Sequence, residues 1–163
     1  MTKRSKREQV LRRNPVQAPF ADVDAVLQGA GFDRDETGGS HVVYRHPLSL
    51  NHVTLSPHNG LVKGYQISTR GARCRTSGGS EVMGVHHVEI TPEVDRLARR
   101  PYNVVVTHED GDYVGRIPEL PGLVTGGETL EEMYAMVEDA KRGWIASALY
   151  HGDPAPDPCS AFV

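Results

Sequence analysis

The sequence predicts an α+β protein built from two small modules, and three observations support this. Its 163 residues suffice for one ordinary domain or for two of about 60 to 80 residues each. The net charge of −3 divides into +6 over residues 1–80 (12 Lys and Arg, 6 Asp and Glu) and −9 over residues 81–163 (6 and 15). The first half has the pattern of helices followed by strands, and the second has strands followed by a helix. We therefore expect domains at residues 1–67 and 101–163, with a linker and a short helix at 68–100.

Composition excludes several classes of protein. Apolar runs such as Val104–Val106 are far shorter than the roughly 20 residues that cross a bilayer. The basic start, Met1–Arg13, lacks the apolar core of a signal peptide, so we expect a cytoplasmic protein. Cys74 and Cys159 are too few and too far apart for a disulfide framework or a cysteine zinc site. The charge division indicates that the basic half binds a polyanion, that the acidic half covers it, or both.

The basic half is predicted to contain two helices and then a three-stranded β-meander. Ser5 and Glu8 have capping-box spacing at the start of a first helix. The second helix has an apolar stripe and ends at Gly31; the stripe is formed by Val23, Val26, Leu27 and Ala30. Three alternating strands follow at residues 32–36, 41–46 and 52–56.

One face of this meander is predicted to be polar. Strand alternation places four side chains on it: His41, Arg45, His52 and Thr54. An imidazole of ordinary pKa about 6.5 exchanges a proton near neutral pH, and a guanidinium binds phosphate. A metal site is not expected, because alternation sends His46 to the face opposite His41 and acidic second-sphere partners are missing from the pattern.

The segment Gly39-Ser-His-Val-Val-Tyr-Arg-His-Pro47, preceded by Gly31-Phe32 and followed by His58–Ile67, resembles the HicA messenger-RNA interferase toxins. The resemblance covers about residues 5–67. It implies a double-stranded-RNA-binding-like α-β-β-β-α domain whose active-site histidine, in the Gly-Ser-His motif, is His41. Ser40, Arg45 and Lys63 would then bind RNA phosphate, with no metal or cofactor.

The closing helix of that fold is predicted to be missing. After Ile67 the chain is rich in Gly, Ser and Arg to residue 84, with no apolar stripe. Its loss exposes apolar surface unless another element covers it. A frame change near residues 68–82 or an internal start at Met83 would also explain this composition. A short helix is then predicted from Thr91-Pro92-Glu93 to Arg100.

The acidic half is predicted to form three strands and a helix. Residues 102–108 and 113–117 flank an Asp-Gly turn and form a hairpin, and residues 123–125 form a third strand. Thr129 and Glu132 make a capping box for a helix. The apolar stripe of that helix comprises Leu130, Met133, Val137, Ala140, Trp144 and Ala148.

Tyr113–Glu132, read as Tyr-Val-Gly-Arg-Ile-Pro-Glu-Leu-Pro-Gly-Leu-Val-Thr-Gly-Gly-Glu-Thr-Leu-Glu-Glu, resembles the HicB antitoxin domain, over about residues 102–158. The resemblance implies a partial ribonuclease-H-like fold without nuclease activity. A homo-oligomer is also expected, because the hairpin edge and the helix that carries Trp144 offer apolar surface that a module of this size can hardly cover alone. The chain ends at Val163 without the DNA-binding extension of many members, so autonomous DNA binding is not expected. Three acidic residues are interpreted as turn and loop residues rather than metal ligands: Asp110, Asp112 and Glu119.

Two functions follow from this sequence. In the first, the chain is a HicA–HicB fusion whose basic half cuts or binds RNA through His41 and whose acidic half neutralises it, within one chain or between chains. In the second, it is a noncatalytic HicB-like oligomerising protein that carries a toxin remnant. The intact Gly-Ser-His motif favours the enzyme, and the missing helix favours the binding protein.

Overall fold

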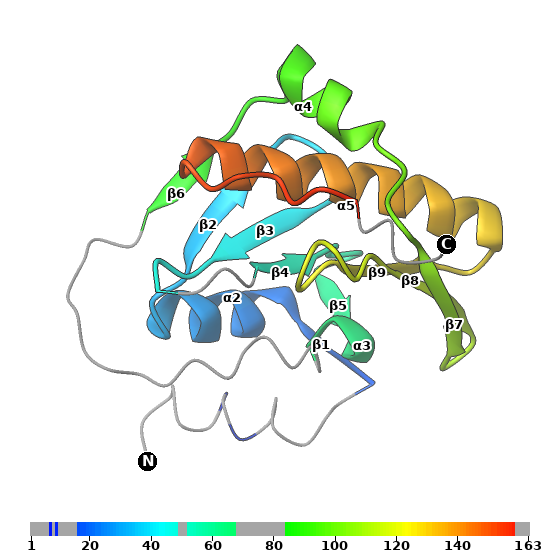
Figure 1. Ribbon diagram of the computed structural model, residues 1–163. Helices are drawn as coiled ribbons and strands as arrows, with labels where there is room; N and C mark the ends of the chain where they lie inside the picture. The colour runs from blue at the N-terminus through cyan, green and yellow to red at the C-terminus, as the bar shows by residue number, and fades with distance from the viewer. Residues whose placement is uncertain (1–6, 8, 10–15, 49–51, 68–83, 159–163) are drawn as a thin grey trace.

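The structure, a computed structural model, describes residues 7, 9, 16–48, 52–67 and 84–158. Short strands and helices precede one long C-terminal helix (Figure 1). The N-terminal half contains β1 (Gln17–Pro19), α2 (Phe20–Gly29), β2 (Asp33–Glu36), β3 (Val42–Arg45), β4 (His52–Leu55), β5 (Leu61–Lys63) and α3 (Gly64–Ile67). The remainder contains β6 (Val85–His87), α4 (Pro92–Ala98), β7 (Val105–Glu109), β8 (Asp112–Arg116), β9 (Val124–Gly127) and α5 (Leu130–Tyr150). The predicted α+β class is confirmed.

The predicted β-meander forms the centre of the N-terminal half. β2, β3 and β4 pair antiparallel in that order. Helix α2 lies on one face of this sheet (Figure 1). Its apolar stripe and side chains of β3 and β4 form a single core. That core includes Val23, Leu27, Tyr44, Val53 and Leu55. β1 and β5 form a separate two-stranded sheet beside it.

The connecting segment, residues 68–100 between the two predicted domains, contributes a strand that the sequence pattern does not predict. Residues 85–87 form β6, which pairs parallel with β2 and widens the sheet to the order β4-β3-β2-β6. The predicted short helix is present as α4, and the Thr91 side chain accepts a hydrogen bond from Val94 N at 3.3 Å. Most of the predicted first helix, and the Gly-, Ser- and Arg-rich segment 68–83, lie outside the described residues.

The C-terminal half has the predicted hairpin, third strand and helix. Asp110 and Gly111 have φ values of 50° and 89°, which are the two left-handed positions of a type I′ hairpin turn between β7 and β8. β9 pairs with β8. At the start of α5, Thr129 Oγ1 accepts from Glu132 N at 3.1 Å, and Glu132 Oε2 accepts from Glu128 N at 2.9 Å.

Helix α5 packs between the β7-β8-β9 sheet and the four-stranded sheet. One side lies on the β7-β8-β9 sheet and beside α4, and the other crosses the four-stranded sheet on the face opposite α2 (Figure 1). Val43, on that face, is fully buried, and a Cβ on Gly143 would lie 3.5 Å from Val43 Cγ2. α5 therefore covers the sheet face on which the sequence predicts polar site residues.

A backbone contact also joins the halves. β4 meets the loop before β9, where His52 N donates to Pro121 O and Thr54 N donates to Gly122 O, both at 3.3 Å. Trp144 of α5 donates from Nε1 to the same Pro121 O at 3.0 Å. Gly122 has φ 84°, and a Cβ there would lie 1.4 Å from His52 O, so glycine is required at this position. Within the described ranges, helices are too short or too polar to cross a membrane.

Candidate functional site

His41 lies directly before β3 and is enclosed by the C-terminal half. Its side chain is only 1% exposed. Nδ1 lies 2.6 Å from Asp139 Oδ2 of α5, and Nε2 lies 2.8 Å from Thr125 Oγ1 of β9. Both ring nitrogens are therefore hydrogen-bonded to the other half, and a proton exchange with a third group requires that these contacts open.

The Gly-Ser-His motif surrounds one carboxylate. Ser40 N donates to Asp139 Oδ2 at 2.9 Å, beside the bond from His41. A Cβ on Gly39 would lie 2.5 Å from Asp139 Oδ1, so the absence of a side chain at Gly39 lets the carboxylate approach the backbone. The hydrogen bond with His41, and then the charge of His41 and the Ser40 amide, hold the pKa of Asp139 below its ordinary value against the opposing effect of burial.

Two further predicted site residues also bind carboxylates of the C-terminal half. Arg45 Nε donates to Asp153 Oδ2 at 2.7 Å, and this bond is the main cause that lowers the pKa of Asp153. Lys63 Nζ lies 2.9 Å from Asp112 Oδ2. His41, Ser40, Arg45 and Lys63 thus contact three aspartates. Lys63 reaches its aspartate from the separate β1–β5 sheet, not from the sheet that carries His41 and Arg45.

At one contact across the interface, the acidic residue belongs to the N-terminal half. Asp35 of β2 is fully buried. It accepts a hydrogen bond from Ser147 Oγ, and its Oδ2 lies 3.0 Å from His151 Nε2. Sequence reasoning missed Asp35, Ser147, Asp139 and Thr125. Charge complementarity of the halves pointed to such contacts in general, but the participating positions depend on how α5 lies across the sheet.

Two histidines near β3 and β4 pack against aromatic rings. His46 packs edge-on against Phe32, with ring centroids 5.1 Å apart, and the His52 ring lies 4.3 Å from that of Trp144. Among the described residues, metal-ligand spacing occurs in a different set, which comprises Asp33, His86 and His151.

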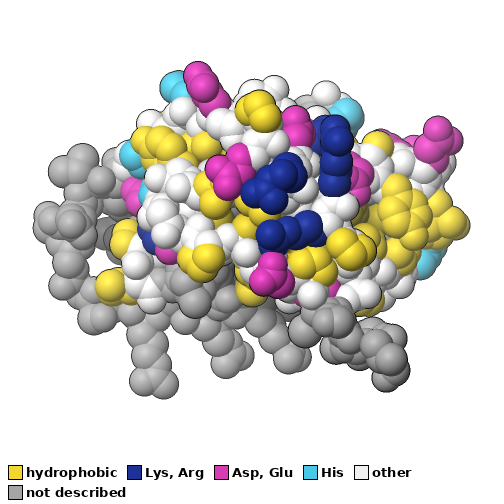
Figure 2. All heavy atoms as spheres, turned by 45° about the horizontal axis from the view of Figure 1, so that its top comes forward, with side chains coloured by type: hydrophobic (Ala, Val, Ile, Leu, Met, Phe, Trp, Pro, Cys, Tyr) yellow, Lys and Arg dark blue, Asp and Glu magenta, His cyan; other side chains and the backbone are white. Residues whose placement is uncertain are grey.

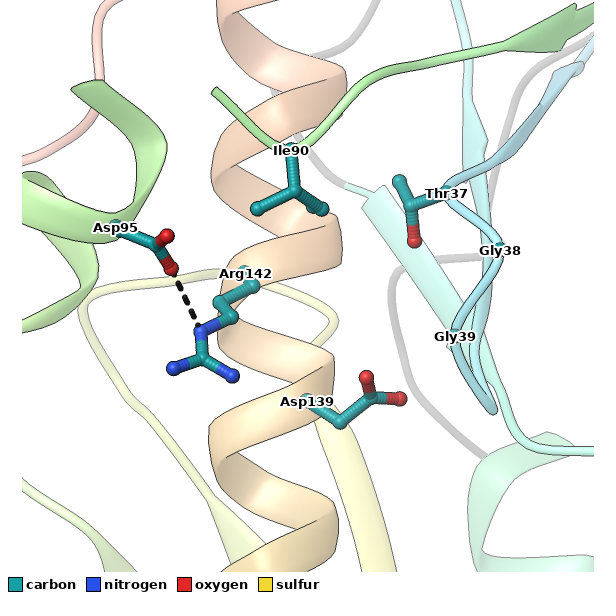
Figure 3. A pocket seen from close by; sticks show the side chains of 7 residues that line it. All are labelled: Thr37, Gly38, Gly39, Ile90, Asp95, Asp139 and Arg142. Carbon is teal, nitrogen blue, oxygen red and sulfur yellow. Dashed lines mark ion pairs between the residues drawn. The ribbon is translucent and has the colours of Figure 1, made fainter. Parts of the chain in front are cut away.

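A pocket of about 340 Å³ adjoins the enclosed histidine. Figure 3 shows Thr37, Gly38 and Gly39 on one wall and Asp139 and Arg142 of α5 on the other. Arg142 Nε pairs with Asp95 Oδ1 of α4 at 3.0 Å. Through this pocket, solvent reaches Asp139, whose side chain is 36% exposed. His41, on the other side of that carboxylate, remains buried.

The C-terminal half matches known proteins. The UPF0150-like family matches residues 100–156. The UPF0150 protein Ta0767 of Thermoplasma acidophilum is 39% identical over 56 residues, which are 34% of this chain and 81% of that protein. No solved structure matches. The match supports the HicB-like interpretation of this half and does not extend to residues 5–67. Through residues 100–156, the chain belongs to the UPF0150-like family.

Proposed function

We propose that this chain is a toxin–antitoxin fusion of the HicA and HicB kind, in which the N-terminal half binds and cuts RNA and the C-terminal half neutralises it. The observation that carries this proposal is the pairing of His41, Ser40, Arg45 and Lys63 with carboxylates of the acidic half. Carboxylates and phosphates accept hydrogen bonds from the same donors. In this proposal the three aspartates bind the same donors that RNA phosphates would bind.

The chemistry assigned to the opened site is general acid–base catalysis. His41 would take the proton of a ribose 2′-hydroxyl, or give a proton to the departing 5′-oxygen, as the 2′-oxygen attacks phosphorus and the bond to the 5′-oxygen breaks. Arg45 and Lys63 would bind the phosphate oxygens and offset their negative charge. In the closed chain Thr125 and Asp139 occupy both ring nitrogens, so we expect the wild-type protein to be almost inactive.

The direct test opens the interface without cutting the chain. The triple variant D112N/D139N/D153N removes three negative charges and changes the net charge from −3 to zero. A matched control, E89Q/E128Q/E131Q, makes the same change at exposed positions of residues 84–158. We expect the first variant to cut a labelled single-stranded RNA and the control to resemble the wild type. Adding H41A to the first variant should abolish cutting while the circular dichroism spectrum is kept.

RNA affinity gives a second readout that does not depend on catalysis. Each phosphate contact on a single strand contributes about −0.7 to the slope of log affinity against log salt. With Arg45 and Lys63 freed, a slope near −1.4 lowers the affinity about sevenfold between 50 and 200 mM salt. A folded triple variant that binds RNA with this salt dependence but leaves it uncut would contradict the catalytic role of His41.

The competing function is a noncatalytic binding protein with a toxin remnant. The burial of His41 favours it, and so does the restriction of the family match to residues 100–156. It predicts that the triple variant neither cuts RNA nor binds it more tightly than E89Q/E128Q/E131Q does.

We also propose that the C-terminal half joins a second copy of the chain. Figure 2 looks onto the face formed by α4 and α5, and hydrophobic side chains gather toward one end of it. Near the start of α5 and on β7, three apolar side chains are 46–49% exposed: Val105, Leu130 and Tyr134. β7 is also an edge strand of its sheet. Sedimentation at tens of micromolar should give a dimer or larger assembly, and a monomer would contradict this proposal.

A further inference from the structure

Three metal-ligating side chains meet where β2, β6 and the end of α5 come together. Asp33 begins β2, His86 is the middle residue of β6, and His151 caps α5. Each offers a donor atom, and these atoms lie within 4.8 Å of one another. All three residues are half-buried. They belong to the N-terminal half, the connecting segment and the C-terminal half respectively.

The backbone around this cluster holds Asp33 and His86 close together. β6 runs parallel to β2, with Asp35 opposite His86. Asp33 Oδ1 accepts a hydrogen bond from Gly84 N at 3.1 Å. A Cβ on Gly84 would lie 2.6 Å from His86 Cε1. The His86 ring therefore lies against Gly84, the residue whose amide binds Asp33. Glycine at position 84 permits this arrangement.

A second sphere of polar groups orients the two histidines. His151 Nε2 lies 3.0 Å from Oδ2 of the fully buried Asp35, which Ser147 also binds. The Tyr150 hydroxyl lies 3.3 Å from His86 Nδ1. A histidine that binds a metal through one ring nitrogen commonly binds a carboxylate through the other, and this partner fixes its orientation.

We propose that Asp33, His86 and His151 bind a divalent transition-metal ion, with Zn²⁺ the best match. Two imidazoles and one carboxylate are a common zinc ligand set, with water as the fourth ligand. Tetrahedral bonds of about 2.0–2.1 Å place ligand atoms about 3.4 Å apart, so each donor must move inward by less than about 1 Å. The ion would connect β6 and α5 to β2 and strengthen the contact between the halves. This proposal does not rest on the proposed function.

Binding of Zn²⁺ to the full chain tests the site. The C74S/C159S background removes both thiols as competing ligands. We expect isothermal titration to give one Zn²⁺ per chain, and Co²⁺ to give the intense visible absorption of a tetrahedral site. H86A should weaken Zn²⁺ binding by more than about tenfold. H87A is the matched control, because His87 is the next residue of β6 and its side chain is 85% exposed.

D33N adds a variant that keeps the size of the side chain and should also weaken binding, because an amide is a poorer zinc ligand than a carboxylate. Equal Zn²⁺ affinities of H86A and H87A would overturn the proposal, as would the absence of Zn²⁺ binding at tens of micromolar by a folded wild-type chain. Each of these results leaves the RNA experiments with D112N/D139N/D153N unaffected.

Discussion

Replacing Gly122 by alanine should open the backbone contact between the two halves. The added Cβ would lie 1.4 Å from His52 O, whereas a comfortable contact between a carbon and an oxygen needs more than about 3 Å. Because backbone atoms lie on both sides of this contact, a side-chain rotation cannot relieve it. The loop that carries Pro121 and Gly122 must move away from β4, and its two hydrogen bonds to His52 N and Thr54 N are then lost.

The expected cost has two parts. Alanine in the left-handed conformation, at φ 84°, costs about 1–2 kcal/mol. The two lost hydrogen bonds add about 0.5–1.5 kcal/mol each. The matched control is G111A, because Gly111 has φ 89° and a Cβ there would have open space around it. G111A should therefore lose only the conformational part of the unfolding free energy. G122A should lose about 1–3 kcal/mol more than G111A.

Urea unfolding followed by tryptophan fluorescence measures this difference. Trp144 is the only tryptophan of the sequence, is 3% exposed and donates to Pro121 O, so its emission reports on this interface. G122A should shift the native emission to longer wavelength, and G111A should not. If both variants lose equal stability and their emission is unchanged, the inferred close contact of Gly122 with β4 is wrong.

Three further outcomes follow from the interface. The pKa values of Asp139 and Asp153 are lower in the folded protein than in the unfolded chain. Their ionised carboxylates therefore stabilise the folded protein above the unfolded pKa near 4, and this stabilisation is lost as pH falls. D139N should reduce the fall of unfolding free energy between pH 5 and 3. W144F keeps a ring but loses the hydrogen bond to Pro121 O. It should lower the free energy of unfolding by about 1 kcal/mol, measured by urea unfolding followed by circular dichroism because this variant has no tryptophan. Burial, and then the charge of Asp112, raise the pKa of Tyr65 to about 12; stability should therefore fall as pH rises from 10 to 12, and Y65F should weaken that fall in alkaline unfolding.

Local signals made much of the fold predictable. The Asp110-Gly111 turn needs two left-handed residues in sequence, and the Thr129 cap acts within one helical turn, so both depend on neighbouring residues alone. β1, β5 and β6 were not predicted, because each has three residues and gains its partner from a distant segment. Strands this short carry too little alternation to be recognised.

The interface was predictable in kind but not in detail. The sequence indicates that an acidic half faces a basic one, yet it does not select Asp139 among the acidic residues. The apolar stripe read from α5 accounts for one side of that helix. Gly143 and Ser147, which face the other sheet, are small residues without a hydrophobic signal, and Leu130 of the predicted stripe is 46% exposed. Packing against two sheets at once removes the simple periodicity on which such a reading depends.

The position of α5 in the chain has a consequence for synthesis. α5 covers the sheet of the N-terminal half but is translated after it, and about 80 residues separate the end of α3 from the end of α5. At roughly 5 to 20 residues per second, the ribosome needs about 4 to 16 s to add them. During that interval the sheet face that includes Val43 and the buried Asp35 has no covering helix, and the hydrogen bonds of His41 to Thr125 and Asp139 form only after those two residues have been translated.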